Sequence, residues 1–231
     1  MKQHTLYTAV GLFRRRQDGL GRSYPVIEIN RKEYLLDMQE MVLWTCLSWR
    51  ILDPEQLQAA YERTVKDLTP ALSRPYEDCV DRLLVRGLAV SGVGETGTDA
   101  LYDLLGSLYV VPVSSSLLLH VWTFLKLTLW DHIPVSKARS LFQKDRPNQE
   151  ERRVLELSKQ ALLSTAEIIK CVEASTYDIS DDNKLLTALY GDEHTTSENI
   201  PFLMRSAVSS RSVILAVSNL YLRKQIIFQR V

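Results

Sequence analysis

The sequence predicts a mainly α-helical protein with small β-hairpins, in which a helical middle region joins two similar units. Three observations support this class. Short strand-like segments bounded by turn residues lie near both ends of the chain, helical spacing of apolar residues fills most of the rest, and one pattern of segments occurs twice. The predicted units are residues 1–97 and 177–231, and the predicted middle region is 98–176.

The N-terminal region is expected to begin with a hairpin. Residues 7–13 and 24–29 are rich in apolar and aromatic side chains, and the turn-forming sequence Q-D-G-L-G-R lies between them. A second turn at 30–32 leads into the short segment 33–36. These signals predict strands at the start of the first unit.

Helices are expected from Met38 onward, where the apolar residues change to helical spacing. The sequence from Asp53 to Gln56 predicts an N-cap, a proline in the first turn and a capping box, for a helix that runs to about Lys66. A further helix from Ser73 is expected to end at Arg86, because Gly87 suits a left-handed C-cap.

The remainder of the chain is expected to be mostly helical. A helix at 99–106 is predicted after the cap residue Thr98, and the pattern Ser164-x-x-Glu167 predicts a capping box for a helix at 165–175. Other expected helices lie at 117–130, 150–163, 179–189, after Thr195-x-x-Glu198, and from Ser209 to a strand at 226–228.

An internal repeat relates residues 72–90 to residues 209–227 without a gap. The alignment pairs Ser73 with Ser210, Arg74 with Arg211, Val80 with Val217, Leu83 with Leu220 and Arg86 with Arg223. Both blocks read as a helix entered through Ser-Arg, a basic residue at its end, and then an apolar strand. With the capped helix that precedes each block, this order is typical of a helix-turn-helix followed by a wing.

The C-terminal copy resembles winged helix-turn-helix regulators of the MarR and PadR type over roughly 183–231, and 36–92 resembles them more loosely. The resemblance implies that the helix entered through Ser210-Arg211-Ser212 lies in the major groove of double-stranded DNA, and that the protein is a dimer. One departure is that Lys224 or Gln225 stands where the family usually has glycine before the wing.

Helical spacing places Val213, Val217 and Leu220 on the core side of that helix and predicts which side chains face outward. The candidate DNA-binding residues are Arg205, Ser210, Arg211, Ser212, Leu215, Ser218, Asn219, Arg223, Lys224 and Arg230. In this group arginine suits guanine, asparagine suits adenine, and leucine suits the methyl group of thymine. The basic residues at 205, 223, 224 and 230 are expected to contact phosphates.

Charge distinguishes the two copies. The chain has no net charge, but residues 199–231 hold five basic residues and no acidic one. In the first copy the outward positions carry Glu77, Asp78 and Asp81, which would repel phosphates. The first unit is therefore expected not to read DNA, and instead to bind a protein, a ligand or a second subunit.

A second resemblance leads to an alternative function. The stretch that begins at Ile27, I-E-I-N-R-K-E-Y-L-L-D-M-Q-E-M-V-L-W, followed by a capped helix and by R-G-L-A-V, resembles small PqqD-like winged domains. Such domains present the edge of a sheet to a peptide. By this resemblance the protein would be a non-catalytic adaptor that binds a protein or a peptide.

Residues 92–97 contain G-x-G-x-x-G, the spacing of a dinucleotide-binding turn. That function requires an acidic residue about 20 residues later for the ribose, and no Asp or Glu occurs between Asp103 and Asp131. We therefore interpret residues 91–97 as a glycine-rich hairpin turn or wing tip.

The sequence contains no other motif that indicates an enzyme, a metal site or a cofactor. The four histidines are scattered, and the three cysteines are far apart and odd in number, which favours a reducing cytoplasm. The N-terminus has no hydrophobic segment of a secretory signal, and the most apolar stretch, Leu117–Trp130, is shorter than the roughly 20 residues of a membrane span. That stretch is our candidate for a homodimer contact.

Overall fold

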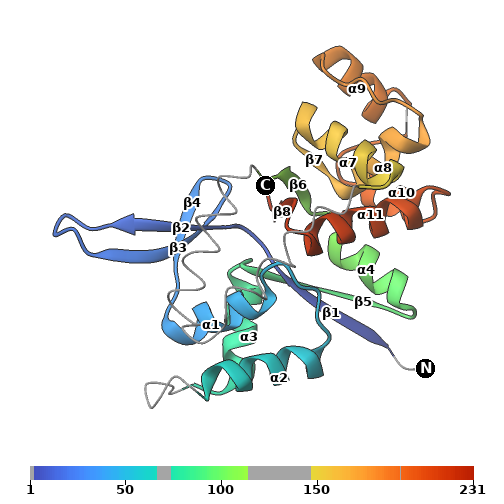
Figure 1. Cartoon of the computed structure of the whole chain (residues 1–231). Coiled ribbons are helices and arrows are strands. Elements are labelled where there is room, and N and C mark those ends of the chain that lie inside the picture. The colour runs from blue at the N-terminus through green and yellow to red at the C-terminus, as the bar shows by residue number, and fades with distance from the viewer. Residues whose placement is uncertain (1–2, 67–73, 114–146, 193) are drawn as a thin grey trace.

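The fold is of mixed α/β class, as the computed structural model in Figure 1 shows for residues 3–66, 74–113, 147–192 and 194–231. Helices account for 47% and strands for 21% of these residues. The expectation of a mainly α chain is therefore correct for the large helical share, but it underestimates the strands. These strands form three small antiparallel sheets.

The first sheet is a three-stranded meander of β2 (Leu12–Gln17), β3 (Ser23–Ile29) and β4 (Lys32–Leu35). Its two long strands extend away from the helices as a ribbon (Figure 1). The turn between β3 and β4 consists of Asn30 and Arg31, both with positive φ (46° and 62°), as a two-residue hairpin turn requires.

The prediction of a single strand at 7–13 is wrong in one respect, because this segment is divided between β1 (His4–Ala9) and β2. Gly11 has a φ of 97°, and a Cβ at this position would lie 2.6 Å from the side chain of Ile27. The break sends the two strands into different sheets, so that β1 pairs with β5 (Ala89–Gly94) and β2 pairs with β3.

The first helical unit consists of α1 (Met38–Leu47), α2 (Pro54–Val65) and α3 (Tyr76–Val85). The strand β1 comes earlier in the chain, with the meander β2–β4 between it and α1, and it forms an isolated bridge with Leu52 after α1 and a ladder with β5 after α3. Residues 91–94 therefore lie in a strand, and the expectation of a hairpin turn at 91–97 is wrong for them.

The elements of residues 109–229, called the second unit from here on, have a similar order without the meander. The strand β6 (Tyr109–Pro112) precedes α7 (Gln149–Gln160), β7 (Leu163–Ser164) and α8 (Thr165–Glu173) follow, and the unit ends with α11 (Ser210–Leu222) and β8 (Ile226–Gln229). The sheet order is β7-β6-β8, so β6 lies between two partners, as β1 lies between Leu52 and β5. Helix α4 (Gly97–Leu105) connects the units, and α9 (Asp182–Tyr190) and α10 (Ile200–Met204) lie between α8 and α11.

The residues paired by the sequence repeat occupy equivalent places. Arg86 follows α3 as its C-cap and Arg223 follows α11 as its C-cap, and each precedes a residue with positive φ, Gly87 (68°) or Lys224 (61°). Each arginine binds a buried glutamate at the third position of the unit's first helix, Glu40 in the first unit and Glu151 in the second.

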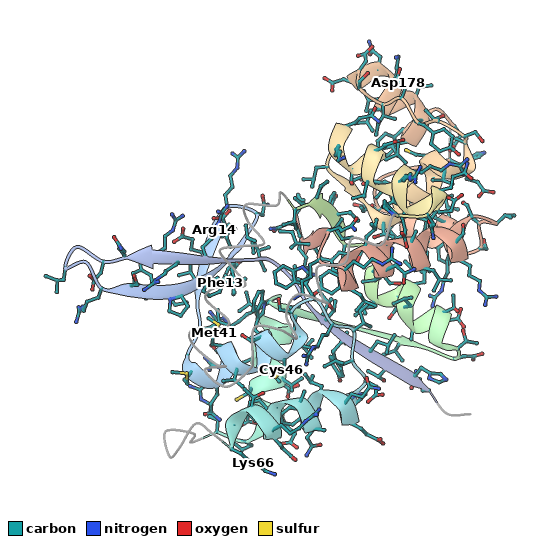
Figure 2. All side chains as sticks on the ribbon, in the orientation of Figure 1. Phe13, Arg14, Met41, Cys46, Lys66 and Asp178 are labelled. Carbon is teal, nitrogen blue, oxygen red and sulfur yellow. The ribbon has the colours of Figure 1, made fainter. Side chains whose placement is uncertain are left out.

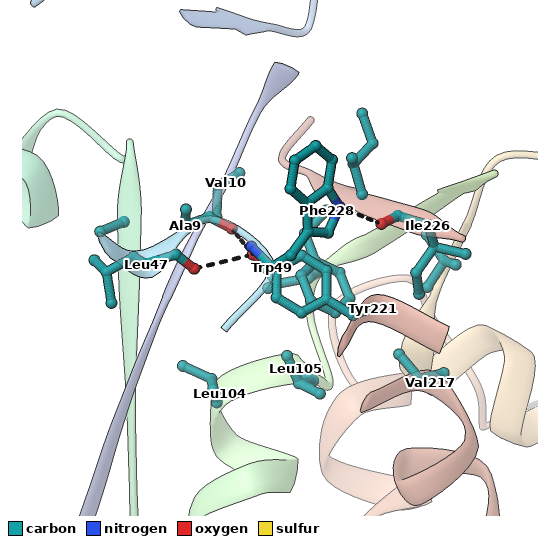
Figure 3. Packing of buried hydrophobic residues seen from close by; sticks show 14 of the residues in the cluster. Ala9, Val10, Leu47, Trp49, Leu104, Leu105, Val217, Tyr221, Ile226 and Phe228 are labelled. Atoms are coloured by element: carbon teal, nitrogen blue, oxygen red, sulfur yellow. Dashed lines mark hydrogen bonds between the residues drawn. The ribbon is translucent and has the colours of Figure 1, made fainter. Parts of the chain in front are cut away.

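One hydrophobic core spans both units and contains residues of all three predicted regions. Where the units meet, the buried hydroxyl of Tyr221 accepts a hydrogen bond from the N–H of Trp49 at 2.9 Å, and its ring packs on Phe228 (Figure 3). Burial raises the pKa of Tyr221 to about 12, so this hydroxyl stays neutral. The indole of Trp49 in turn donates to the carbonyl of Ile226 at 3.3 Å.

Candidate functional site

The exposed face of α11 contains four of the ten candidate DNA-binding residues. Arg211, Ser212 and Leu215 are exposed and Asn219 is half-buried. They follow helical spacing along one side of α11, and no carboxylate lies in this helix. Among the positions predicted to read bases, these four form a continuous surface.

Ser210 and Ser218 do not lie on that surface, because both side chains are buried. The hydroxyl of Ser218 donates to the carbonyl of Leu215 in its own helix at 2.9 Å. Helical spacing alone misplaced Ser218, since α11 packs against α7, α8 and α4 and eight of its thirteen residues are buried.

The four basic residues predicted to contact phosphates each contact another part of the protein. The guanidinium of Arg205 lies 5.8 Å from the ring centroid of Tyr102, and the Lys224 ammonium lies 5.5 Å from that of Trp49. Arg223 binds the buried carboxylate of Glu151 at 2.8 Å. The guanidinium of Arg230 lies against Gly87. None of these four side chains extends freely from the α11 face.

The N-terminus of α11 is occupied by a carboxylate of the same chain. The backbone N–H of Ser209 donates to Glu173 Oε2 at 3.0 Å, and hydrogen bonds from the side chain and backbone of Ser209 lower the pKa of Glu173. The segment between α8 and α11 also contains two helices, whereas a helix-turn-helix has a turn of about three or four residues. Both features differ from the predicted DNA-reading arrangement.

A second candidate surface is the outer edge of β4. Ile29 and Lys32 flank the two-residue turn and form a hydrogen-bonded pair, and the pairs alternate from there along the strands. The N–H and C=O groups of Glu33 and Leu35 therefore point away from β3. Within the described part of the chain no strand pairs with this edge.

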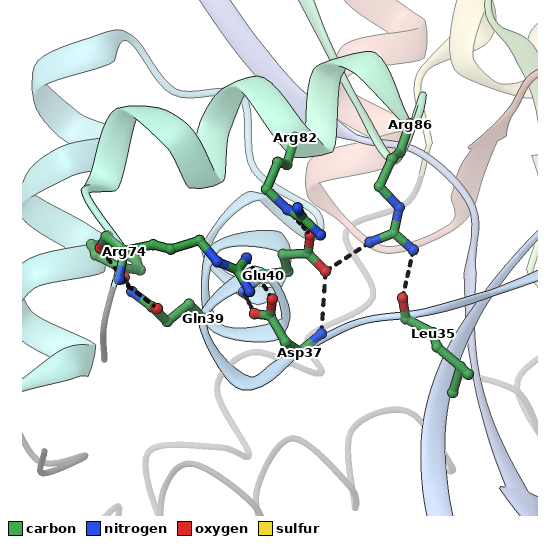
Figure 4. Close-up of polar contacts among 8 residues, drawn as sticks. Leu35, Asp37, Gln39, Glu40, Arg74, Arg82 and Arg86 are labelled. Carbon is green, nitrogen blue, oxygen red and sulfur yellow. Dashed lines mark hydrogen bonds and ion pairs between the residues drawn. The ribbon is translucent and has the colours of Figure 1, made fainter. Parts of the chain in front are cut away.

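The C-terminal end of α3 reaches the end of β4 through the side chain of its C-cap residue, Arg86. Arg86 Nη2 donates to the carbonyl of Leu35, and its Nη1 donates to Glu40 Oε2 at 2.7 Å (Figure 4). Arg82 Nε donates to the other oxygen of Glu40 at 2.7 Å. The Glu40 side chain is only 1% exposed. The three side chains therefore form a fixed ionic cluster next to β4.

Exposed apolar and acidic side chains lie on the elements that carry this cluster. Leu35 and Met38 are exposed where β4 leads into α1, and Val85 is exposed on α3 beside Arg86. The acidic residues expected to face outward on α3, Glu77, Asp78 and Asp81, are exposed. An apolar surface with a nearby charged margin is common at protein-binding sites.

The basic ribbon of β2 is largely neutralised by its neighbours. Arg14 pairs with Glu28 at 3.5 Å, and Arg16 Nε donates to Glu33 Oε1 at 2.6 Å. These ion pairs lie across strands on one face of the sheet. Arg15 lies on the opposite face, because side chains alternate along a strand.

The cysteines are buried and free of disulfide bonds. Cys46 of α1 faces α2, with its Sγ 3.8 Å from Thr64 Oγ1 (Figure 2). Burial raises the pKa of the Cys46 thiol, and a neutral buried thiol is a poor nucleophile. Among the described residues, no group of three or more His, Cys, Asp or Glu side chains is placed to hold a metal ion.

No helix in the described ranges is long and apolar enough to cross a bilayer. The candidate dimer contact, Leu117–Trp130, lies outside the described residues. Comparison with protein-family models, with curated proteins and with solved structures finds no match to this chain.

Proposed function

We propose that the protein is a non-catalytic adaptor, and that it binds an extended segment of a partner protein along the free edge of β4. The observation that carries this proposal is the set of outward N–H and C=O groups of Glu33 and Leu35, of which the Leu35 carbonyl already accepts a hydrogen bond from Arg86. A strand that adds to a sheet edge gains main-chain hydrogen bonds there and takes its specificity from side-chain pockets. A three-stranded sheet followed by three helices also agrees with the PqqD-like resemblance of this region.

The expected affinity of such a site is modest. Each main-chain hydrogen bond contributes only about 1 kcal/mol net, because it replaces a bond to water. The short edge of β4 offers few of them. The exposed side chains of Leu35, Met38 and Val85 are the apolar surface that would supply the rest of the binding free energy.

Proline at position 33 tests this proposal with little effect on the fold. The N–H of Glu33 points outward, so Glu33→Pro removes an edge donor without removing a ladder hydrogen bond. Peptides are first selected on the wild-type protein from a displayed library of random short peptides. These peptides should bind Glu33→Pro at least about tenfold more weakly than the wild type, because one main-chain hydrogen bond is lost and the proline ring clashes with the added strand. Fluorescence anisotropy with the labelled peptides measures the change.

Two variants serve as controls for Glu33→Pro. Glu33→Ala removes the side chain that pairs with Arg16 but keeps the backbone donor, so it should bind nearly as the wild type does. Arg15→Pro makes the same backbone change on the outer edge of β2, where Arg15 faces Pro25. Equal loss of binding in Arg15→Pro and Glu33→Pro would contradict binding at β4.

We also propose that each unit is a winged helix. The support is the shared element order, in which α1, α2, α3 and β5 correspond to α7, α8, α11 and β8. In the second unit the segment with α9 and α10 would then be an insertion between the second and third helices of the motif.

A second candidate function, sequence-specific binding of double-stranded DNA in transcription regulation, is supported by the α11 face of Arg211, Ser212, Leu215 and Asn219. This face is exposed and free of carboxylates. Enrichment of random duplex DNA on the purified protein is the test. If a motif is enriched at physiological salt, Arg211→Ala should cost about 1–3 kcal/mol of binding free energy and relax the preference at one base. Absence of enrichment would remove this candidate.

A further inference from the structure

We propose that Arg86 makes the β4 edge selective for partner segments that carry an acidic side chain next to Leu35. This inference rests on the proposed function, since it assigns the chemistry of the peptide that the edge binds. It follows from the position of the guanidinium at the end of the edge and from the contacts that hold it there.

Arg86 is fixed in place before any peptide binds. Its guanidinium is held by the buried carboxylate of Glu40, whose second oxygen is bound by Arg82 (Figure 4). Glu40 is itself fixed in the capping box of α1, where its Oε2 accepts the N–H of Asp37 at 3.2 Å. A side chain held in this way loses little rotamer freedom on binding a ligand.

The guanidinium retains donors for a partner. An arginine side chain has five N–H donors, and two of those of Arg86 bind Glu40 and the carbonyl of Leu35. The side chain is 27% exposed, so part of it can be reached from solvent. A carboxylate is the ligand that a guanidinium binds best, because two parallel N–H···O bonds match its geometry.

The charge balance at this end of the edge favours an acidic ligand. Arg82 and Arg86 share the single carboxylate of Glu40, which leaves a net positive charge in the cluster. The nearby carboxylates of Glu33 and Asp37 are each paired with an arginine of their own, Arg16 and Arg74. On α3 the nearest acidic residue, Asp81, lies about 7.5 Å from Arg86 along the helix axis and Asp78 about 12 Å, given about 1.5 Å per residue.

The second unit provides a matched arginine without such an edge. Arg223 occupies the position of Arg86 and binds Glu151 in the same way, but among the described residues its side chain donates to no strand carbonyl as Arg86 does to Leu35. Replacing Arg223 therefore perturbs an equivalent ionic contact while leaving β4 untouched.

The experiment compares acidic and neutral forms of one peptide. Peptides are first selected from a displayed random library on the wild-type protein, and the enriched sequences should share an Asp or Glu at one position. The best binder and its Asp→Asn or Glu→Gln form are then titrated against the wild type, Arg86→Gln and Arg223→Gln. The neutral peptide should bind the wild type and Arg223→Gln about tenfold more weakly than the acidic peptide, but should bind Arg86→Gln as well as the acidic one does.

The outcomes separate this inference from the proposed function. Two results would overturn the role of Arg86 while binding at β4 stands. One is that the enriched peptides share no acidic position, and the other is that the neutral peptide loses as much affinity for Arg86→Gln as for the wild type. If no peptide is enriched, or if Glu33→Pro binds as the wild type does, the proposed function itself fails. Should Arg86→Gln not fold, Arg86→Lys keeps the charge but loses the paired donors, and it should show a smaller preference for the acidic peptide than the wild type.

Discussion

Replacement of Glu40 by glutamine is expected to lower the free energy of unfolding by about 3 kcal/mol. The carboxylate is buried and both of its oxygens accept hydrogen bonds from arginines. An amide removes the counter-charge of Arg82 and Arg86 and turns an N–H₂ group toward one of them. Because Arg82 is 51% exposed and stays hydrated, we expect the lower part of the range for broken buried ion pairs.

The same variant should change the dependence of stability on pH. Burial raises the pKa of the Glu40 carboxyl, but hydrogen bonds from Arg82, Asp37 and Arg86 outweigh this and leave the pKa below its ordinary value. A carboxyl whose pKa is lower in the folded state stabilises the fold above the unfolded pKa of about 4.3, and this contribution is lost as the pH falls through the folded pKa. Urea unfolding of Glu40→Gln should therefore show a shallower loss of stability in acid than that of the wild type.

Glu151→Gln is the matched control for Glu40→Gln. Glu151 has the same position in the second unit, but its Oε2 accepts from one arginine, Arg223, and from the N–H of Asn148, while its Oε1 has no hydrogen-bond partner among the described residues. Glutamine at position 151 removes the ion pair with Arg223, but it also removes negative charge from the buried Oε1, which accepts no hydrogen bond from a described residue. We expect a smaller loss than in Glu40→Gln, and equal losses would mean that the double arginine contact is not what makes Glu40 important.

Local signals in the sequence predicted helix starts well where a cap and its partner are close in the chain. The capping boxes Asp53–Gln56 and Ser164–Glu167 are confirmed. Two other caps are wrong. Thr96, not Thr98, caps α4, and Thr195 is buried and binds Lys170 instead of starting a helix. The first error is one of register, because Thr96 bonds Asp99 three residues later, whereas Thr195 meets Lys170, which is distant in the sequence and is not revealed by local composition.

The candidate sites depended on contacts across the chain and were only partly predictable. The helical period located the exposed stripe at Arg211 and Leu215, but burial of Ser218 depends on which helices pack around α11. The Asn30-Arg31 turn could be recognised from the sequence, whereas the contact of Arg86 with Leu35 joins residues 51 apart and appears only when α3 lies beside β4. The repeat aligned Arg86 with Arg223, but gave no indication of their glutamate partners.

Gly92→Ala is expected to destabilise the protein by about 3 kcal/mol or more, because no space exists for one added carbon. A Cβ on Gly92 would lie 2.3 Å from the backbone N of Leu104 and 2.5 Å from the carbonyl oxygen of Ala100. Both atoms belong to the backbone of α4, so no side-chain rotation relieves the contact. Since β5 also pairs with β1, the strand cannot move away from the helix without breaking its ladder.

The three glycines of G-x-G-x-x-G allow this explanation to be tested inside the motif. Gly94 has the same close approach as Gly92, with a Cβ placed 2.3 Å from the backbone N of Ala100, whereas nothing lies within 4 Å of a Cβ on Gly97. Gly97 opens α4, where alanine should be neutral or stabilise by up to about 1 kcal/mol through the unfolded state. Thermal unfolding of the three alanine variants should therefore show two large losses and no loss at Gly97. A phosphate-binding turn would not give that order of losses, because its glycines serve a ligand and not the packing of β5 on α4. An unchanged Tm for Gly92→Ala would rule out the packing explanation.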